Sequence, residues 1–152
     1  MDSEDIVRTY SDMIYKIAYR YVSNGADAED VFSEVWLIYF KKERTFETEK
    51  HRKAWLIRVT INAAKNILSK RTYTVETMDR VRTPEAGSAV EERMDLEKAI
   101  ERLRPEYREV ICLYYLQGLP VKTIGMILDR NENTVKVHLM RAREELRRYM
   151  GE

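Results

Sequence analysis

The sequence has few of the residues that build tight turns, disulfide bonds or metal sites. Its 152 residues include five glycines, three prolines, two histidines and one cysteine. A single cysteine, Cys112, excludes an internal disulfide bond and every zinc site that needs several cysteines. We expect Cys112 to be a buried, inert thiol, because it stands between Ile111 and Leu113 on a predicted helix. The two histidines, His51 and His138, lie far apart in the sequence and predict no metal site.

Long apolar runs and enzymatic motifs are also missing. No stretch approaches the roughly 20 apolar residues needed to span a bilayer, and the acidic N-terminus lacks the core of a signal peptide. No glycine-rich phosphate loop, metal-ligand spacing or Ser-His-Asp set appears. We therefore expect a cytoplasmic protein that is not an enzyme and has no cofactor, no metal and no small-molecule substrate.

Charged residues are plentiful, and their two signs are segregated along the chain. Residues 1–49 carry 6 basic and 11 acidic side chains, a net charge of −5, and residues 50–82 carry 9 and 2, a net charge of +7. Residues 83–129 carry 6 and 9 (−3), and residues 130–152 carry 6 and 4 (+2). The overall charge of +1 therefore hides alternating acidic and basic segments. This pattern is typical of a protein that meets another protein with one surface and DNA with another.

Apolar residues recur every three or four positions through most of the chain, which predicts helices. The first half has three such segments, at about 5–22, 27–40 and 52–71. Gly25 is predicted to end the first helix in the left-handed conformation, and Asp27 to cap the second. The segment 41–50 between the second and third helices has no periodicity and is predicted to be a charged loop.

Residues 72–89 are rich in Thr, Pro, Gly and Ser and poor in large aliphatic residues, so we predict a flexible linker there. Four further helical segments follow, at about 90–103, 105–117, 120–128 and 132–150. No alternating pattern predicts a strand, so the predicted fold is all-α, with two small helical domains at 1–71 and 90–152. Domains this small bury only about 60% of their unfolded surface, and we expect a partner to stabilise them.

The last two helical segments are predicted to form a helix-turn-helix, because a short helix, a turn at 129–131 and a longer basic helix suit DNA binding. Gly125 interrupts the short helix at a cost of about 1 kcal/mol relative to Ala, which indicates a close crossing of the two helices. In the last helix an apolar stripe is predicted to face inward: Val135, Leu139, Ala142 and Leu146. The opposite face offers amide, basic and apolar groups that can reach phosphates and base edges: Asn133, Lys136, Val137, Met140 and Arg141. A solvated helix at the end of a bundle would show the same stripe.

Two blocks of the sequence resemble one protein family. The segment AIERLRPEYREVICLYYLQGLPVKTIGMILDRNENTVKVHLMRAREELRRYM resembles the fourth conserved region of bacterial sigma factors, which reads the minus-thirty-five promoter element. Its most specific pieces are LRPEYREV and TVKVHLMRAREEL. In the first block, DAEDVFSEVW and AWLIRVTINAAKNIL resemble the second region of the same family. With these two regions alone, the chain resembles the extracytoplasmic-function (ECF) group.

The resemblance implies an RNA polymerase sigma factor for a stress or envelope regulon. Its implied partners are the beta-prime and beta subunits of core RNA polymerase, promoter DNA and an inhibitory anti-sigma factor. The second helix would dock on the coiled coil of the largest polymerase subunit through Asp30, Ser33 and Glu34. A helix-turn-helix regulator that does not bind core polymerase is the alternative, and co-purification with core polymerase distinguishes the two.

The resemblance also implies two sets of DNA contacts. The third helix and the loop before it would melt and hold the minus-ten element, with a flipped base near Asn62 and phosphate attraction from the +7 segment. The implied minus-ten residues are His51, Arg52, Lys53, Trp55, Asn62, Lys65, Asn66, Lys70 and Arg71. The implied minus-thirty-five residues are Asn131, Asn133, Thr134, Lys136, Val137, His138, Met140 and Arg141. Among them His138 is expected to contact the DNA backbone and not a base.

The sequence departs from the family pattern at several positions. Ser33 stands where the family usually has Gln, and Asn66 where it has an acidic residue. In the turn, Asp129 and Arg130 replace the usual Gly and buried aliphatic residue. Further departures in the last helix are Asn133, Val137 and His138. Aspartate tolerates the left-handed conformation better than most residues, so we still expect a turn at Asp129.

Overall fold

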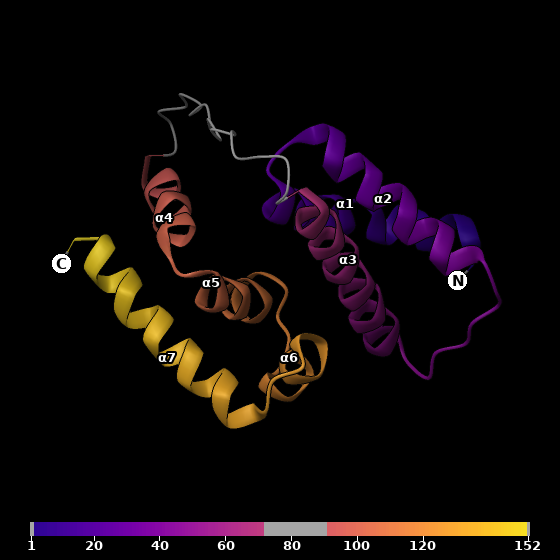
Figure 1. Cartoon of the computed structure of the whole chain (residues 1–152). Coiled ribbons are helices and arrows are strands. Elements are labelled where there is room, and N and C mark those ends of the chain that lie inside the picture. Colours follow the sequence, from indigo (N-terminus) through magenta and orange to yellow (C-terminus); the bar gives the residue numbers. More distant parts are fainter. Residues whose placement is uncertain (1, 72–90, 152) are drawn as a thin grey trace. The chain divides into compact units, whose positions relative to one another are not determined.

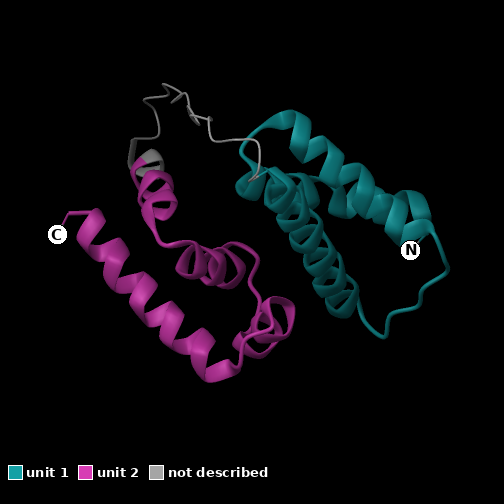
Figure 2. Ribbon diagram, viewed as in Figure 1, with its two compact units in different colours: residues 1–82 teal, residues 83–152 magenta. Residues whose placement is uncertain are grey.

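The chain is described here by a computed structural model at residues 2–71 and 91–151, with the backbone alone at 91–94, and within these ranges every regular element is a helix. The helices group into two units, Met1–Arg82 and Thr83–Glu152 (Figures 1 and 2). The predicted all-α fold with two helical domains is thus confirmed. The predicted linker, residues 72–89, lies outside the described residues.

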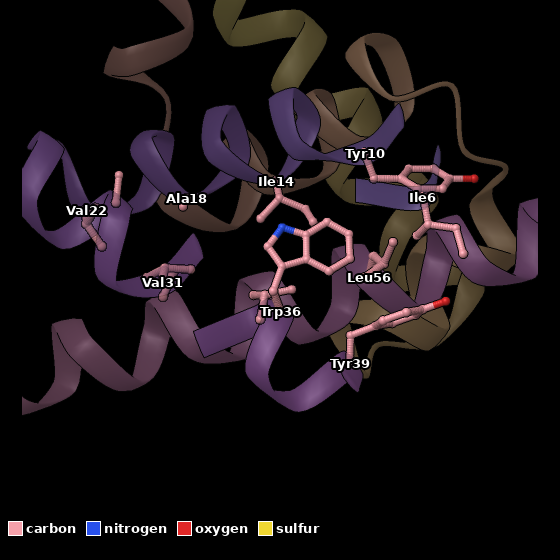
Figure 3. Packing of buried hydrophobic residues seen from close by; sticks show 12 residues of the cluster. Ile6, Tyr10, Ile14, Ala18, Val22, Val31, Trp36, Tyr39 and Leu56 are labelled. Carbon is pink, nitrogen blue, oxygen red and sulfur yellow. The ribbon is translucent and has the colours of Figure 1, made fainter. Parts of the chain in front are cut away.

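The N-terminal unit is built from three helices, α1 (Ser3–Val22), α2 (Gly25–Phe40) and α3 (Glu49–Arg71). A spacing of about four residues keeps side chains on one face of a helix, and α1 buries such a stripe: Ile6, Tyr10, Ile14, Ala18 and Val22. Figure 3 shows these side chains gathered with Val31, Trp36 and Tyr39 of α2 and Leu56 of α3. The three helices therefore share one apolar core.

The junction between α1 and α2 differs from the prediction. Ser23, and not Gly25, takes the left-handed conformation that ends α1, with a φ of 63°. Asn24, and not Asp27, caps α2: its side chain accepts from the Asp27 N–H at 2.8 Å and donates to the Asp27 carboxylate at 2.9 Å. Asp27 is buried and also pairs with Arg71 at the far end of α3, at 2.9 Å. This ion pair joins the start of α2 to the end of α3.

The α3 helix begins three residues earlier than predicted, because Thr48 accepts from the His51 N–H at 3.0 Å and so caps it. Its fully buried positions are Leu56, Ile57, Thr60, Ile61 and Ala64. One of these positions is a threonine, which a pattern of apolar residues does not identify as a core residue. The Thr60 hydroxyl is satisfied inside the core by donating to the Leu56 carbonyl oxygen at 2.7 Å.

The C-terminal unit contains α4 (Glu91–Arg102), α5 (Pro105–Ile111), a π-helical turn η2 (Cys112–Leu116), α6 (Val121–Leu128) and α7 (Glu132–Tyr149). Pro105 is the first residue of α5, where a missing N–H costs nothing. The predicted single helix after Pro105 widens at η2, where the Gln117 N–H donates to the Cys112 carbonyl oxygen at 3.1 Å. Cys112 is only half-buried, so the expectation of a buried thiol is wrong.

Helices α6 and α7 form the predicted helix-turn-helix. Asp129 ends α6 in the left-handed conformation with a φ of 60°, and Asn131 caps α7 by accepting from the Thr134 N–H at 2.9 Å. A Cβ added to Gly125 would lie 2.6 Å from the Arg130 carbonyl oxygen. The close approach that excludes a side chain at Gly125 is therefore to the turn, and not to a crossing helix as the sequence suggested.

We predict that Gly125→Ala destabilises the C-terminal unit. Overpacking against a backbone carbonyl should outweigh the gain in helix propensity and lower the free energy of unfolding by about 1–3 kcal/mol. Both tryptophans lie in the N-terminal unit, so the loss should appear in thermal unfolding followed by circular dichroism and not by tryptophan fluorescence. Gly25→Ala is the matched control: its Cβ would lie 3.5 Å from the Tyr15 hydroxyl, an ordinary contact. Equal effects of the two substitutions would contradict this account.

Candidate nucleic-acid interface

The side of α3 that faces away from the core is polar. Asn62, Lys65, Asn66 and Ser69 repeat at spacings of three and four and are all exposed. They line a shallow groove together with residues of α2 that include Glu34. Amide and ammonium groups in such a row can reach base edges and phosphates. The structure thus brings together three of the predicted minus-ten residues, Asn62, Lys65 and Asn66.

The loop before α3 is held on an aromatic cluster by Phe46. Its ring stacks on Tyr39 at a centroid distance of 6.4 Å and lies 5.8 Å from the Trp55 ring. The Arg44 guanidinium lies 4.4 Å above the Trp55 ring, a cation–π geometry. Trp55 is half-buried in this cluster, and the exposed His51 meets the edge of Phe46 at 5.2 Å. The cluster fixes the path of the loop beside the predicted minus-ten face.

Arg52 is turned into the N-terminal unit, with a side chain only 14% exposed. Its Nε donates to both Glu49 carboxylate oxygens at 3.2 Å, and its Nη1 donates to the Tyr39 hydroxyl at 2.6 Å. The Tyr10 hydroxyl donates to the same carboxylate at 2.7 Å. Burial, and then the hydrogen bond to Glu49, raise the pKa of Tyr10 to about 12; that bond also holds the pKa of Glu49 below its usual value. Arg52 therefore joins α1, α2 and α3 and uses its hydrogen bonds inside the unit.

The remaining predicted minus-ten residues are placed differently from one another. His51 and Lys70 are exposed, whereas Lys53 is half-buried. Arg71 is exposed but pairs with Asp27, as described above. The +7 charge of this segment is thus partly engaged in contacts within the unit.

The exposed side of α2 carries the predicted polymerase-binding residues Asp30, Ser33 and Glu34. Beside them lie two exposed apolar side chains that were not predicted from the sequence, Leu37 (72% exposed) and Phe40 (47%). A shallow apolar groove surrounds these two residues and includes Ser33. The spacing from Asp30 to Leu37 is seven residues, which places both on one face and is the signal that could have identified Leu37.

The exposed side of α7 presents most of the predicted minus-thirty-five residues. Those in contact with solvent are Asn131, Asn133, Lys136, Val137, Met140 and Arg141. Thr134 is half-buried, and the side chain of Asn131 is already engaged as the cap of α7. The predicted inward stripe is buried at Val135, Leu139 and Ala142, so the opposite face is open along the first three turns.

His138 is set apart from this exposed face. It is half-buried, with its ring centroid 5.6 Å from that of Tyr107 and its Nδ1 at 3.4 Å from Nη1 of Arg130. Burial, and then the charge of Arg130, hold the pKa of His138 below its usual value of 6.5. Arg130 also donates to the Glu106 carbonyl oxygen at 3.1 Å and forms an ion pair with Glu109. Arg130 stands out in the sequence as an unusual residue of the turn, but its partners could not be predicted from the sequence.

No helix in the described ranges is long and apolar enough to cross a membrane. Among these same residues, no group of three or more His, Cys, Asp or Glu side chains could hold a metal ion.

Two helical units, the second ending in a helix-turn-helix with an exposed basic face, define a DNA-binding protein of the helix-turn-helix class. The family model described as Sigma-70 region 2 matches residues 6–73, and that described as Sigma-70, region 4 matches residues 93–146. Similar sequences along most of the chain are ECF sigma factors. The chain therefore belongs to the sigma-70 family of RNA polymerase sigma factors, in its ECF group.

Individual relatives show how far the similarity extends. The chain is 28% identical to SigE of Mycolicibacterium smegmatis over 97% of its own length, and it spans 61% of the length of SigE. It is 28% identical to SigW of Bacillus subtilis, with 96% of this chain and 87% of SigW covered. The sigma factor RpoE of Bartonella quintana, crystallised with the anti-sigma factor NepR, matches with a TM-score of 0.80 and 22% identity over 97% of this chain and 95% of RpoE. CnrH, solved with the cytosolic domain of CnrY, matches with a TM-score of 0.66 and 19% identity over 94% and 83% of the two chains. These two structures show a shared fold.

We predict that Arg52→Ala lowers the free energy of unfolding of the N-terminal unit by about 1.5–3 kcal/mol, because charge-assisted hydrogen bonds to Glu49 and Tyr39 are lost. Tryptophan fluorescence during urea unfolding measures this change. Arg58→Ala, which removes an exposed arginine from the same helix, should change stability by no more than about 0.5 kcal/mol. A loss of similar size in both variants would show that Arg52 has no special structural role.

We predict that the C-terminal unit loses stability as the pH falls from about 7.5 to about 5.5, the range in which histidine titrates. Because the pKa of His138 is lowered in the folded unit, the unfolded chain binds its proton first, so acidification favours unfolding. Arg130 and Arg141 oppose protonation of the ring, whereas Glu106 and Glu109 favour it. His138→Gln should remove this part of the pH dependence in thermal unfolding; an unchanged profile would contradict the prediction.

Proposed function

We propose that this sigma factor acts in promoter opening through three exposed helix faces. The face of α2 docks on core RNA polymerase, that of α3 holds the minus-ten element and that of α7 reads the minus-thirty-five element. The observation that carries the proposal is that α2, α3 and α7 each bury one face and expose the opposite one with suitable side chains. The protein contributes no catalytic step: the polymerase performs the chemistry, in the cytoplasm where both promoter and polymerase are found.

On α2, the proposed contact with the beta-prime coiled coil combines charge and apolar area. Asp30 and Glu34 lie one turn apart and can pair with basic residues of the polymerase. Leu37 extends the same face and offers an apolar centre that these charges surround.

On α3, the exposed amides of Asn62 and Asn66 are proposed to contact a base extruded from the minus-ten element. Extrusion costs a few kcal/mol, which hydrogen bonds to the base edge and stacking must offset. The ordered loop around Phe46 supports the proposal, because a preorganised loop loses less conformational entropy when it binds a base. Lys65 and Lys70 supply phosphate attraction.

On α7, Lys136 and Arg141 are proposed to contact guanines or phosphates in the major groove, and Val137 and Met140 thymine methyl groups or sugars. The two apolar side chains remain 40% and 48% exposed, which a DNA surface would reduce. Because His138 is half-buried, we propose that it supports this face from the inner side of α7.

An anti-sigma factor is proposed to hold the protein inactive. RpoE and CnrH share its fold; RpoE was solved with the anti-sigma factor NepR, and CnrH with the cytosolic domain of CnrY. The exposed apolar residues Leu37 and Phe40 on α2 and Tyr115, Leu116 and Met126 in the C-terminal unit offer area for such a partner.

We predict that the double variant Asp30→Lys/Glu34→Lys no longer binds core polymerase, because like charges would face each other across the interface. Size-exclusion co-elution of the variant with purified core enzyme measures binding, and circular dichroism checks the fold. The control Glu4→Lys/Asp12→Lys makes the same change of charge on exposed positions of α1 and should bind normally. Wild-type affinity of the α2 variant would refute the proposed docking face.

We predict that substitutions on the two proposed reading faces change different parts of the promoter preference. In transcription by reconstituted holoenzyme on a scan of single base-pair changes, Asn62→Ala should relax selectivity only in the minus-ten element. Arg141→Ala should relax it at one or two upstream base pairs, by the roughly 1–3 kcal/mol that a bidentate arginine–guanine contact is worth. Arg147→Ala, farther along α7, should weaken all sequences evenly or not at all. Identical profiles for all variants and the wild type would exclude these faces as readers.

A further inference from the structure

The turn between α6 and α7 contains a partly buried charged side chain. Arg130 is 17% exposed and its partner Glu109 10%. A charge taken out of water is unfavourable unless it is paired and hydrogen-bonded. Arg130 meets this requirement with three partners: the Glu109 carboxylate, the Glu106 carbonyl oxygen at 3.1 Å and Nδ1 of His138 at 3.4 Å.

These partners belong to two helices. Glu106 and Glu109 lie on α5, one turn apart, whereas His138 lies on α7. The Arg130 guanidinium therefore connects α7 to α5, and the tilted contact between the rings of His138 and Tyr107 of α5 adds a second connection. Apolar contacts have no preferred direction, whereas a planar guanidinium donates in fixed directions. Such a connection restricts the rotation of α7 about its own axis as well as its distance from α5.

The backbone of Arg130 is fixed from the opposite side. Its N–H donates to the Gly125 carbonyl oxygen at 2.9 Å. Its own carbonyl oxygen lies where a Cβ on Gly125 would clash, at 2.6 Å. The residue is thus held by α6 through its main chain and by α5 through its side chain, and the next residue, Asn131, caps α7.

The exposed face of α7 begins immediately after this point. Lys136 and Val137 precede His138 in the helix, and Met140 and Arg141 follow it. A rotation of α7 would move all four side chains together relative to any surface that they contact. Hydrogen bonds to base edges depend on both distance and direction, so a small rotation would alter which base pair is preferred.

We propose that Arg130 is a positioning residue for promoter recognition: held by Glu109 and the Glu106 carbonyl group, it sets through His138 the rotation of α7 and thereby the base preference of its exposed face. The inference rests on the proposed function, in which α7 reads the upstream promoter element. The lowered pKa of His138 agrees with it. A neutral ring can accept from Arg130 at Nδ1, whereas an imidazolium would lose that acceptor and place a second positive charge beside the guanidinium.

The test compares Arg130→Met, the double variant Arg130→Met/Glu109→Met and the control Lys98→Met, which removes one positive charge from the exposed side of α4. Each full-length variant is reconstituted with core RNA polymerase and given a promoter library randomised in the upstream element, and the transcripts are sequenced. Thermal unfolding is measured in parallel. The double variant separates a role of Arg130 in positioning α7 from a role in stabilising the turn. Replacing a buried ion pair by apolar residues of similar size often leaves stability unchanged or improved, so that selectivity can change without a loss of stability.

We expect Lys98→Met to select the same promoter sequences as the wild type. In both Arg130 variants, the preference for the favoured base should fall roughly fivefold or more at one or more base pairs, which is about the worth of one base contact. A double variant that is as stable as the wild type but less selective supports positioning. A double variant that is equally stable and equally selective overturns the inference, because Arg130 would then only stabilise the turn. A wild-type holoenzyme without any upstream preference would instead overturn the proposed function itself, and the inference with it.

A second pair of variants leaves the ion pair in place. His138→Phe keeps a ring against Tyr107 but offers Arg130 no acceptor, whereas His138→Gln keeps an acceptor. We expect the Phe variant to lose selectivity and the Gln variant to retain most of it. Equal selectivity of the two variants would contradict a connection that runs through the Arg130–His138 contact.

Discussion

Burial of one face of each principal helix is the constraint on which the rest of this structure depends. Units of this size have no further layer that could cover a helix on both sides, so each long helix is divided between core and solvent. On α3 this puts Leu56 and Ile61 inside and Asn62 and Lys65 outside; on α7 it buries Leu139 and exposes Met140. The proposed functional surfaces follow directly from this division. The proposed contacts with polymerase and DNA therefore lie on regular, well-packed helices, where backbone geometry fixes the spacing of the side chains.

Long-range polar contacts supplement these small cores. The Asp27–Arg71 pair closes the N-terminal unit between residues far apart in sequence, and the Glu49–Arg52 pair joins all three of its helices with the help of Tyr10. These arginines were part of the +7 segment that pointed to DNA. A count of basic residues therefore overestimates the charge available to phosphates, because some of that charge is neutralised inside the unit. The exposed lysines of α3 remain better candidates for DNA contact than its partly buried arginine.

The sequence predicted the helices, the helix-turn-helix and the exposed faces well, because these depend on local periodicity and on turn residues. It predicted the details of junctions poorly. Ser23 and not Gly25 adopts the left-handed conformation, since Asn24 and Asp27 form a mutual cap that draws Gly25 into α2. The long-range contacts of the side-chain networks, such as those of Tyr10 with Glu49, Asp27 with Arg71 and Glu109 with Arg130, could not be predicted, because these residues meet only once the helices have packed. The burial of Thr60 and the exposure of Leu37 were not predicted either, because packing against other helices, and not residue type, determines whether these two side chains are buried.

The two arginine networks occupy equivalent places in their units. Arg52 lies in the first turn of α3, and Arg130 lies just before the cap of α7; each joins the start of a proposed DNA-reading helix to a neighbouring helix. Partly buried ion pairs add little net stability, because desolvation offsets most of their attraction. They do fix orientation, because every bond has a direction. Apolar stripes thus supply most of the stability of each unit, while directed arginine contacts hold the beginning of α3 and of α7. In α7 this is the end from which a helix-turn-helix protein reaches base edges.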